Sequence, residues 1–510
     1  MDISNGLVQN IFFSRLAFLG DKTAFYDYDL QRSYTFKEVN ERSDRAAAFL
    51  TQKLHIQKGD RVGVCALNRI EFFDMFFACY KTGIILTTYN GKLMDWELAD
   101  MIRNEDPGIV FTDRYYKDKV SALRSDFDLK CGQICFDDNG PDGYDAVLSC
   151  EDSFPVNEPE MEDILMLIHT GGTTGIPKAA KLSYRAIVFN AVTKILSHEL
   201  NSSDLVYLTT PLFHTAAWNS VALAFFLAGG TVVLKRRFDV EHVFDIIDRF
   251  KPTVFISVPT IYTKIAEDPR FETTDFSSIR SMWCGASMLP MSLFEKYDRK
   301  NLPLCNSYGL TECGPSNFTF PVRLTTQKML RKKAGFVGKP YQFNKVRVVD
   351  DEGNPVGPNT PGDLEFAGPL TFSGYWNHEE ETRNVVKGEW VSTGDIALYD
   401  EDGFYKIVGR KKNMFISGGE NIFSVEIENV LLTMDDIKDC GVIGVEDNYW
   451  GEVGKAYIVP REKGTLTEEA VIAFCRTKLP SIKIPKQFVF LDALPRNDSG
   501  KLLYRELEKL

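Results

Sequence analysis

Short strand-like runs alternate with helix-like runs along most of the chain, and this alternation restricts the possible folds more than any other feature. "DRVGVCAL" (60–67) and "TVFISVP" (253–259) are apolar and β-branched, which predicts buried strands. "RIEFFDMFFACYKTG" (69–83) predicts an amphipathic helix that ends at Gly83, and Thr35 with Glu38 predicts a capping box at an earlier helix start. Strands that alternate with helices form mostly parallel sheets covered by helices. The sequence therefore predicts an α/β fold with doubly wound subdomains.

The pattern of secondary-structure signals changes twice in the second half of the sequence. After about Gly335, turn signals at 351–353 and 361–362 predict antiparallel sheet, which we expect to form a β-barrel-like part. After "GRKKN" (409–413) the chain has the pattern of a self-contained unit, with strands near 439–445 and 455–460 and a helix near 468–478. We therefore expect a large N-terminal domain over residues 1–410 and a small, mobile α+β C-terminal domain over 411–510.

A run of glycine and threonine follows an apolar strand candidate. In "LIHTGGTTGIPKAAKLS" (167–183), glycine lets several backbone N–H groups point into one concavity, threonine adds hydroxyl donors, and Lys178 adds a positive charge. Such a run suits a di- or triphosphate, although a glycine-rich hairpin without a ligand is the plain alternative. A Walker A loop is excluded, because Pro177 and Ala179 stand where that motif needs Gly and Ser or Thr.

Charge and cysteine usage narrow the class of protein. The net charge is −12 over 510 residues, which argues against nucleic acid or an anionic membrane as the main partner. The start "MDISNGLVQNIFF" lacks the pattern of a secretory signal, and the longest apolar stretch, 221–234, is too short to span a bilayer. The ten cysteines do not cluster as zinc ligands do, and they fit the reducing cytoplasm. We therefore expect a cytoplasmic protein without a membrane span.

Several further segments, taken in order, resemble the motifs of one family. "TGGTTGIPKAA", "PLFH" (211–214), "NSYGLTECGP" (306–315), "GFVGKP" (335–340), "STGDIALYDEDGFYKIVGRKKNMFISGGENIFSVEIE" (392–428) and "PRNDSGKLLYREL" (495–507) are similar to those of the adenylate-forming superfamily. That superfamily includes acyl-CoA synthetases, adenylation domains of peptide synthetases and beetle luciferases. Two positions of the phosphate loop depart from the usual pattern, with Gly171 in place of Ser and Ala179 in place of the last Gly. The resemblance is greatest to AMP-forming acyl-CoA synthetases.

The resemblance implies a two-step reaction and a set of nucleotide contacts. A carboxylate would attack the α-phosphorus of ATP to give acyl-adenylate and pyrophosphate, and coenzyme A would then give acyl-CoA and AMP. Glu312 would bind Mg²⁺, a hard cation that prefers carboxylate oxygen. Tyr308 would lie against the adenine and Asp395 would bind the ribose. The implied nucleotide-binding residues are Thr170, Gly171, Gly172, Thr173, Thr174, Gly175, Lys178, Gly285, Ala286, Tyr308, Gly309, Thr311, Asp395, Arg410 and Lys501.

The resemblance also implies a mobile catalytic lysine. Lys501 would bridge the carboxylate and the α-phosphate during adenylation, as a catalytic residue together with Thr311, Glu312 and Lys178. The C-terminal domain would then rotate about a hinge at Lys412 to admit the thiol. After rotation, the coenzyme A tunnel would be lined by Gly418, Gly419 and Glu420.

The acid that reacts is the least defined part of the prediction. The acyl pocket would include His214, Ala216, Trp218, Cys284 and Gly309, with His214 as a gate. "FHTAAWNSVALAFF" (213–226) contains no acidic residue to meet a substrate ammonium, which disfavours an amino acid. We expect a fatty or simple organic acid, with an aryl acid as the alternative. A stand-alone enzyme that loads a carrier protein, a luciferase-like monooxygenase and a non-catalytic nucleotide-binding relative remain open, and so does a homodimer.

Overall fold

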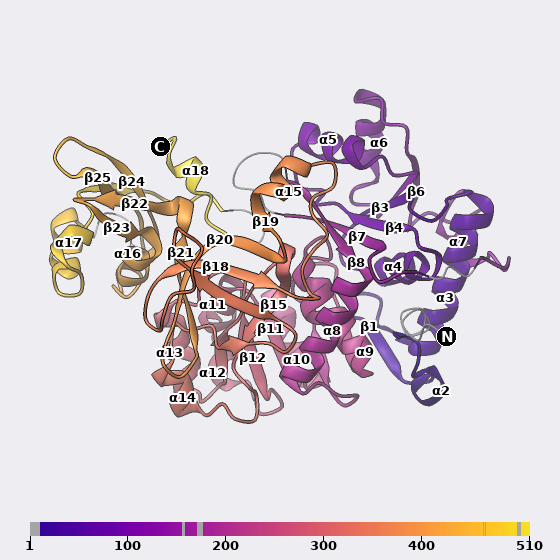
Figure 1. Ribbon diagram of the computed structural model, residues 1–510. Helices are drawn as coiled ribbons and strands as arrows, with labels where there is room; N and C mark the ends of the chain where they lie inside the picture. Colours follow the sequence, from indigo (N-terminus) through magenta and orange to yellow (C-terminus); the bar gives the residue numbers. More distant parts are fainter. Residues whose placement is uncertain (1–10, 156–158, 171–176, 463, 465, 497–500) are drawn as a thin grey trace.

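Two mostly parallel sheets form the centre of the large N-terminal part of the computed structural model (Figure 1). The structure describes residues 11–155, 159–170, 177–462, 464, 466–496 and 501–510. The strands of the first sheet are, in spatial order, β13 (Leu304–Asn306), β12 (Ser281–Cys284), β11 (Val254–Ser257), β9 (Leu205–Tyr207), β10 (Thr231–Leu234), β1 (Thr23–Asp27) and β2 (Arg32–Thr35). The strands of the second sheet are β6 (Gly132–Cys135), β5 (Ile109–Thr112), β3 (Arg61–Cys65), β4 (Ile85–Thr88), β7 (Ile164–His169) and β8 (Ala179–Ser183). Only β2 and β8, each at an edge, run antiparallel to their neighbours.

Helices cover these sheets as the sequence predicts. The capping box of Thr35 and Glu38 opens α3 (Phe36–Ala48), and Gly83 ends α4 (Glu71–Thr82) in the left-handed conformation. The aromatic side chains of α4 are fully buried in the core that joins the two sheets. The other described helices up to β16 are α2 (Leu16–Leu19), η1 (Phe49–Lys53), α5 (Asp95–Glu105), α6 (Lys117–Asp126), α7 (Tyr144–Leu148), α8 (Tyr184–His198), η2 (Ala216–Ala222), α9 (Leu223–Ala228), α10 (Val240–Phe250), α11 (Pro259–Glu267), α12 (Arg270–Thr273), α13 (Met291–Arg299), η3 (Thr311–Cys313) and α14 (Gln327–Lys332).

Antiparallel strands follow, as the turn signals predict. One sheet has three strands, and the other has five, because β21 pairs with β20 beside the four strands of the main path. Their strands and the accompanying helix are β14 (Tyr308–Leu310), β15 (Gly314–Thr319), β16 (Lys339–Pro340), β17 (Lys345–Val349), β18 (Gly362–Ala367), α15 (Glu379–Val385), β19 (Val386–Lys387), β20 (Trp390–Tyr399) and β21 (Tyr405–Arg410).

The C-terminal part has a hydrophobic core of its own. Its core runs from Phe415 to Ile484, whereas the N-terminal core ends at Phe404, so the expected boundary at residue 410 lies between the two cores. The elements of this part are η4 (Lys411–Asn413), β22 (Met414–Ser417), β23 (Glu420–Phe423), α16 (Ser424–Leu431), β24 (Ile437–Asp447), β25 (Gly451–Pro460), α17 (Glu468–Arg476), η5 (Ser481–Lys483), β26 (Gln487–Phe490) and α18 (Tyr504–Leu507). Within the described ranges, no helix is both long enough and apolar enough for a membrane crossing.

Candidate active site

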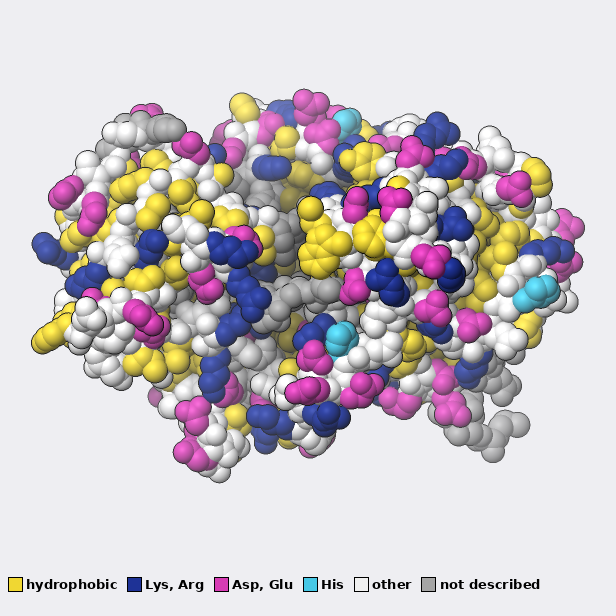
Figure 2. Space-filling model, turned by 90° about the horizontal axis from the view of Figure 1, so that it is seen from above, with side chains coloured by type: hydrophobic (Ala, Val, Ile, Leu, Met, Phe, Trp, Pro, Cys, Tyr) yellow, Lys and Arg dark blue, Asp and Glu magenta, His cyan; other side chains and the backbone are white. Residues whose placement is uncertain are grey.

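A deep cleft lies where several parallel strands end, between the large N-terminal part and the C-terminal part. Residues directly after β7, β11, β12 and β13 line it, as expected for α/β sheets, whose ligands bind beyond the carboxyl ends of the strands. The C-terminal part adds Lys412, Glu428 and Lys501. Figure 2 shows the surface seen from above, where basic side chains gather along the border between the two parts.

The glycine-threonine run joins two antiparallel strands. β7 ends at His169 and β8 begins at Ala179, and these two residues face each other across the hairpin. The backbone N–H of Thr170 donates to the carbonyl of Lys178 at 2.9 Å, which closes the base of the loop. Gly171, Gly172, Thr173, Thr174 and Gly175 lie outside the described residues, so their phosphate contacts stay a prediction.

Lys178 projects from the exit of this hairpin toward an aromatic and an acidic residue. Its ammonium lies 3.2 Å from Glu381 of α15 and 5.8 Å from the centre of the Tyr375 ring. Tyr375 also donates its hydroxyl to the Glu312 carboxylate at 2.7 Å. Tyr375 therefore connects the expected phosphate-binding lysine with the expected metal ligand. Sequence reasoning missed Tyr375, and its only signal is an aromatic residue that follows Gly374 in "FSGYW".

Tyr308, Asp395 and Arg410 form a polar group in the wall of the cleft. The Tyr308 hydroxyl donates to Asp395 at 2.6 Å, and the Arg410 guanidinium contacts the other carboxylate oxygen at 2.8 Å. Asp395 and Arg410 are neighbours across β20 and β21, so the sheet register sets this contact. Burial and the charge of Asp395 hold the pKa of Tyr308 well above its usual value, which keeps the phenol a hydrogen-bond donor at neutral pH.

Backbone rather than side chains forms the cleft wall beside Tyr308. Gly285 donates its N–H to Ser257 at 3.0 Å, and Ala286 has a left-handed φ of 66°. A Cβ at Gly309 would lie 2.2 Å from the carbonyl carbon of Pro315, so only glycine fits there. These residues and Thr311 line the cleft together with Tyr308.

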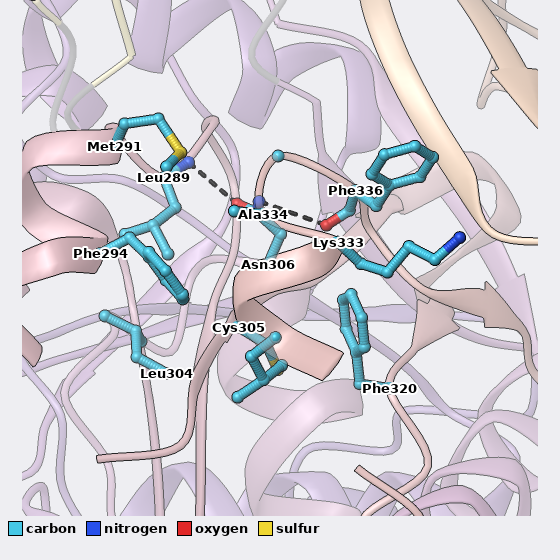
Figure 3. A pocket seen from close by; sticks show the side chains of 12 residues that line it. Leu289, Met291, Phe294, Leu304, Cys305, Asn306, Phe320, Lys333, Ala334 and Phe336 are labelled. Atoms are coloured by element: carbon cyan, nitrogen blue, oxygen red, sulfur yellow. Dashed lines mark hydrogen bonds between the residues drawn. The ribbon is translucent and has the colours of Figure 1, made fainter. Parts of the chain in front are cut away.

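The strand that leads to Tyr308 is held by one side-chain amide. Asn306 accepts the Leu289 N–H at 2.9 Å and donates to the Phe336 carbonyl at 3.3 Å (Figure 3). Phe336 lies in the "GFVGKP" segment, so Asn306 connects that segment to the strand that leads to Tyr308. A small pocket beside it, mostly apolar, is separate from the cleft described above (Figure 3).

Lys501 reaches the cleft from the far end of the chain. Burial and the charge of Arg410 lower the pKa of its ammonium, whereas Asp395 and Glu312 oppose this shift. Lys501 lines the same cleft as these three residues. Partial desolvation, together with Arg410 and Lys501, lowers the pKa of Lys412 to about 8, although the Lys412 side chain is largely exposed.

Two contacts hold the segment that carries Lys501. Arg496, before Lys501, pairs with Asp439 of β24 at 2.6 Å and bridges to Leu502 through its backbone. Tyr504, after it, donates to the Glu428 carboxylate of α16 at 2.9 Å. The base of the loop is thus fixed to the C-terminal sheet and to α16. This positioning depends on contacts with Asp439 and Glu428 that the sequence motifs do not predict.

Glu428 makes the stability of this anchor depend on pH. Burial raises its pKa from 4.5 to about 7. The folded protein therefore holds the proton more tightly than the unfolded chain, and stability falls as pH rises through this window.

Glu428→Gln cannot ionise, so we expect its melting temperature in thermal denaturation to be near that of the wild type at pH 4.5 but a few degrees higher at pH 8. The exposed pair partner of Lys483 gives the control, Glu426→Gln, which should show no such pH-dependent gain. A difference in Tm between Glu428→Gln and the wild type that stays constant from pH 4.5 to pH 8 would contradict the raised pKa of Glu428.

The expected coenzyme A residues do not line the cleft in this orientation. Gly418 and Gly419 form the turn between β22 and β23 with φ of 55° and 85°, and Glu420 is exposed. Their role in a thiol tunnel stays a prediction that requires movement of the C-terminal part. Lys412 lies in η4, the short connection at which such a movement would occur.

The expected acyl-pocket residues divide into two sets. His214, Ala216 and Gly309 line the cleft. Trp218 does not, because its ring packs against Phe72, Phe73 and Phe76 of α4 and its indole N–H donates to Leu212 at 2.6 Å. Cys284 is fully buried in β12 and is not among the cleft residues either. We correct both placements: strand and helix packing directs these side chains into the core.

Comparison with known proteins identifies matching sequences and structures over nearly the whole chain. The profile described as AMP-binding enzyme matches residues 12–376, and that of the AMP-binding enzyme C-terminal domain matches 426–501. A feruloyl-CoA synthase of Amycolatopsis is 33% identical over 93% of both chains, and an indoleacetate–CoA ligase of Aromatoleum aromaticum is 33% identical over 88% of both. The crystal structure of ATP-bound MatB from Rhodopseudomonas palustris superposes with a TM-score of 0.89 at 26% identity over 98% of both chains. The apo form of MatB superposes less well, with a TM-score of 0.80.

Proposed function

Because this chain belongs to the AMP-binding enzyme family and is an AMP-forming acyl-CoA synthetase, we propose that the cleft joins an organic acid with an apolar body to coenzyme A by way of an acyl-adenylate. The convergence of distant residues carries this proposal. Lys501, Asp395 and Glu312 come from different elements and interact electrostatically in one cleft. The closer match to the ATP-bound than to the apo form of MatB supports the view that this is the adenylation orientation.

In the first step, an oxygen of the carboxylate forms a bond to the α-phosphorus of ATP. The bond from that phosphorus to the bridging oxygen breaks, and pyrophosphate leaves. Lys501 stabilises the negative charge that accumulates on the α-phosphate and the incoming carboxylate. Lys178 holds the terminal phosphates, and Asp395 accepts hydrogen bonds from the ribose. Catalysis is thus mainly positioning and charge stabilisation.

In the second step, the thiol of coenzyme A attacks the acyl carbon, and AMP leaves. Lys501 would first withdraw so that the thiol can reach the acyl carbon. A rotation at Lys412 would exchange that segment for the turn at Gly418, Gly419 and Glu420.

The residues present fit a magnesium ion that is held jointly with the substrate. Glu312 offers a carboxylate in the cleft, and Tyr375 orients it through a hydrogen bond to one oxygen. Over the part of the chain that the structure describes, no group of three or more His, Cys, Asp or Glu could hold a metal without further ligands. Mg²⁺ would therefore be held by Glu312 and phosphate oxygens, and it would neutralise charge on the leaving pyrophosphate.

The acid is proposed from the lining of the cleft. Ala216 and Gly309 leave room beside the reacting centre, and η2 (Ala216–Ala222) contributes no acidic residue that could meet a substrate ammonium. A fatty or simple organic acid fits this wall. The two relatives above are named for aromatic acids, which supports the aryl-acid alternative equally.

A library of carboxylic acids tests the proposal. The purified protein is given ATP, Mg²⁺ and each acid, with and without coenzyme A, and AMP and acyl-CoA are measured. We expect acid-dependent pyrophosphate release in both conditions and rapid AMP release only with coenzyme A. AMP release that needs a carrier protein instead would show the carrier-loading alternative. Absence of acid-dependent pyrophosphate release across fatty, aryl and dicarboxylic acids would favour the non-catalytic relative.

The ten cysteines support the proposal of a reducing compartment such as the cytoplasm. All ten are free and buried in the structure. Burial raises the pKa of thiols such as Cys79 and Cys313 well above the usual value, so they pack as small apolar side chains rather than react.

A further inference from the structure

A lysine lies buried in the wall of the cleft, on an element that the mechanism above does not use. Lys194 belongs to α8 and is 1% exposed. It is one of the residues that line the cleft, together with Ser220 and Val221 of η2, against which α8 packs. The site motifs do not include it.

The ammonium of Lys194 has aromatic neighbours but no anionic one among the described residues. It lies 4.6 Å from the centre of the Trp283 ring and 3.4 Å from the hydroxyl oxygen of Tyr341. No carboxylate contributes to its titration, and burial lowers its pKa to about 7. A buried amine without a counter-charge is costly, and such groups are retained where a partner arrives from outside.

The groups around Lys194 cannot serve as that partner. His198, one turn further along α8, contacts the Tyr341 hydroxyl. Burial and the positive charges of Lys194 and Arg280 hold the pKa of His198 well below its usual value, so the imidazole is neutral. Burial raises the pKa of the Tyr341 hydroxyl as well, so it is not an anion. Lys194, Tyr341 and His198 therefore form a polar group that lacks an anion.

This group lies on a different part of the chain from the expected catalytic lysine. α8 packs against η2 and β15 of the large N-terminal part, whereas Lys501 comes from the C-terminal part. An acid whose carboxylate meets Lys501 would direct its other end into the wall that carries Lys194.

We propose that Lys194 selects acids with a second acidic oxygen, either a carboxylate or a phenol, at the end remote from the reacting carboxylate. The proposal rests on the proposed function and narrows its substrate class. The ammonium offers a charged donor to such an oxygen, the Tyr341 hydroxyl accepts from the ammonium and so positions it, and the Trp283 ring covers it. An acid that ends in a methyl group would leave the amine without a partner.

Matched pairs of acids test this inference. Hexanedioate is compared with hexanoate, and 4-hydroxycinnamate with cinnamate, as kcat/KM for acyl-CoA formation. We expect the wild type to prefer the member with the distal oxygen by roughly 10- to 150-fold in at least one pair, the range for a hydrogen bond to a charged group. The pair with the larger ratio distinguishes a carboxylate from a phenol. Lys194→Met keeps an unbranched apolar stem and removes the ammonium, and it should reduce that ratio to near one, mainly through KM.

Lys22→Met is the control. Lys22 is half-buried, donates to Gly229 and Thr231, and lies outside the cleft, so its loss should leave the ratio unchanged. A wild type that prefers the unsubstituted acid in both pairs overturns the inference, as does an unchanged ratio in Lys194→Met. If Lys194→Met does not fold, the inference is tested by the wild-type ratios and by Tyr341→Phe, which should lower the ratio of kcat/KM within the same pair of acids. Thioester formation that favours hexanoate and cinnamate would contradict the role of Lys194 but leave the proposed function intact. If no acid gives a thioester, the proposed function itself is contradicted.

Discussion

Lys501→Ala is expected to slow acyl-adenylate formation by roughly 10²–10³-fold, the usual cost of losing one donor to a developing anion. Lys501 lines the cleft together with Asp395 and Glu312, the groups that would hold the ribose and the metal. The second half-reaction should be unaffected, because in the proposed mechanism Lys501 withdraws before the thiol arrives. The variant should therefore convert supplied acyl-adenylate and coenzyme A to acyl-CoA at the wild-type rate.

The two half-reactions are measured separately. Pyrophosphate release in the presence of acid and ATP reports the first, and acyl-CoA formation from synthetic acyl-adenylate reports the second. Lys509→Ala is the matched control, because Lys509 lies nearby in sequence but is exposed and pairs with Glu506. Normal pyrophosphate release by Lys501→Ala would remove the lysine from the mechanism. Equal loss of both steps would indicate a damaged C-terminal domain instead.

The opposite split is expected for Gly419→Leu, which should slow thioester formation by on the order of 10²-fold and leave adenylation nearly unchanged. In the present orientation, a Cβ at Gly419 meets no atom within 4 Å, so the leucine has space during the first step. After rotation, the same side chain would lie in the proposed thiol tunnel. Single-turnover measurements of both steps test this difference.

Backbone strain needs its own control, because the φ of Gly419 is 85° and leucine is unfavourable there. Gly403 has a φ of 76° in an exposed turn and also has no atom within 4 Å of a built Cβ, so Gly403→Leu introduces comparable strain elsewhere. It should destabilise the protein similarly while both half-reactions proceed. If Gly419→Leu and Gly403→Leu have the same kinetics, the tunnel assignment is wrong.

Periodicity and cap chemistry predicted much of the fold. The capping box at Thr35, the end of α4 at Gly83 and the change to antiparallel strands after Gly335 all follow from local signals, and the structure confirms them. The order of the strands in the two sheets does not follow from local signals. β9 lies between β10 and β11, and β7 joins β4, because of contacts between segments far apart in the sequence.

The residues of the candidate site could be predicted where they belong to a sequence motif. They could not be predicted where tertiary packing determines the direction or the neighbours of a side chain. Tyr308, Asp395 and Arg410 are brought together as the resemblance implies. Trp218 and Cys284 were placed wrongly, because their direction depends on helix and strand packing that the motif does not encode. Tyr375, Glu428 and Lys194 were missed for the same reason: each is significant only through neighbours that lie more than 60 residues away in sequence, such as Tyr375 and Glu312.

The position of Arg410 has a mechanical consequence for the order of events in the cleft. Arg410 is fixed to Asp395 across β20 and β21, and Lys412 follows two residues later. A rotation at Lys412 would take place beside the proposed nucleotide site. The ribose contact would hardly move, whereas Lys501, far from Lys412 along the chain, would move a long way. The adenylate would thus remain bound while one face of the C-terminal domain replaces another at the cleft. Its release as AMP would then depend on loosening the ribose contact rather than on the swing.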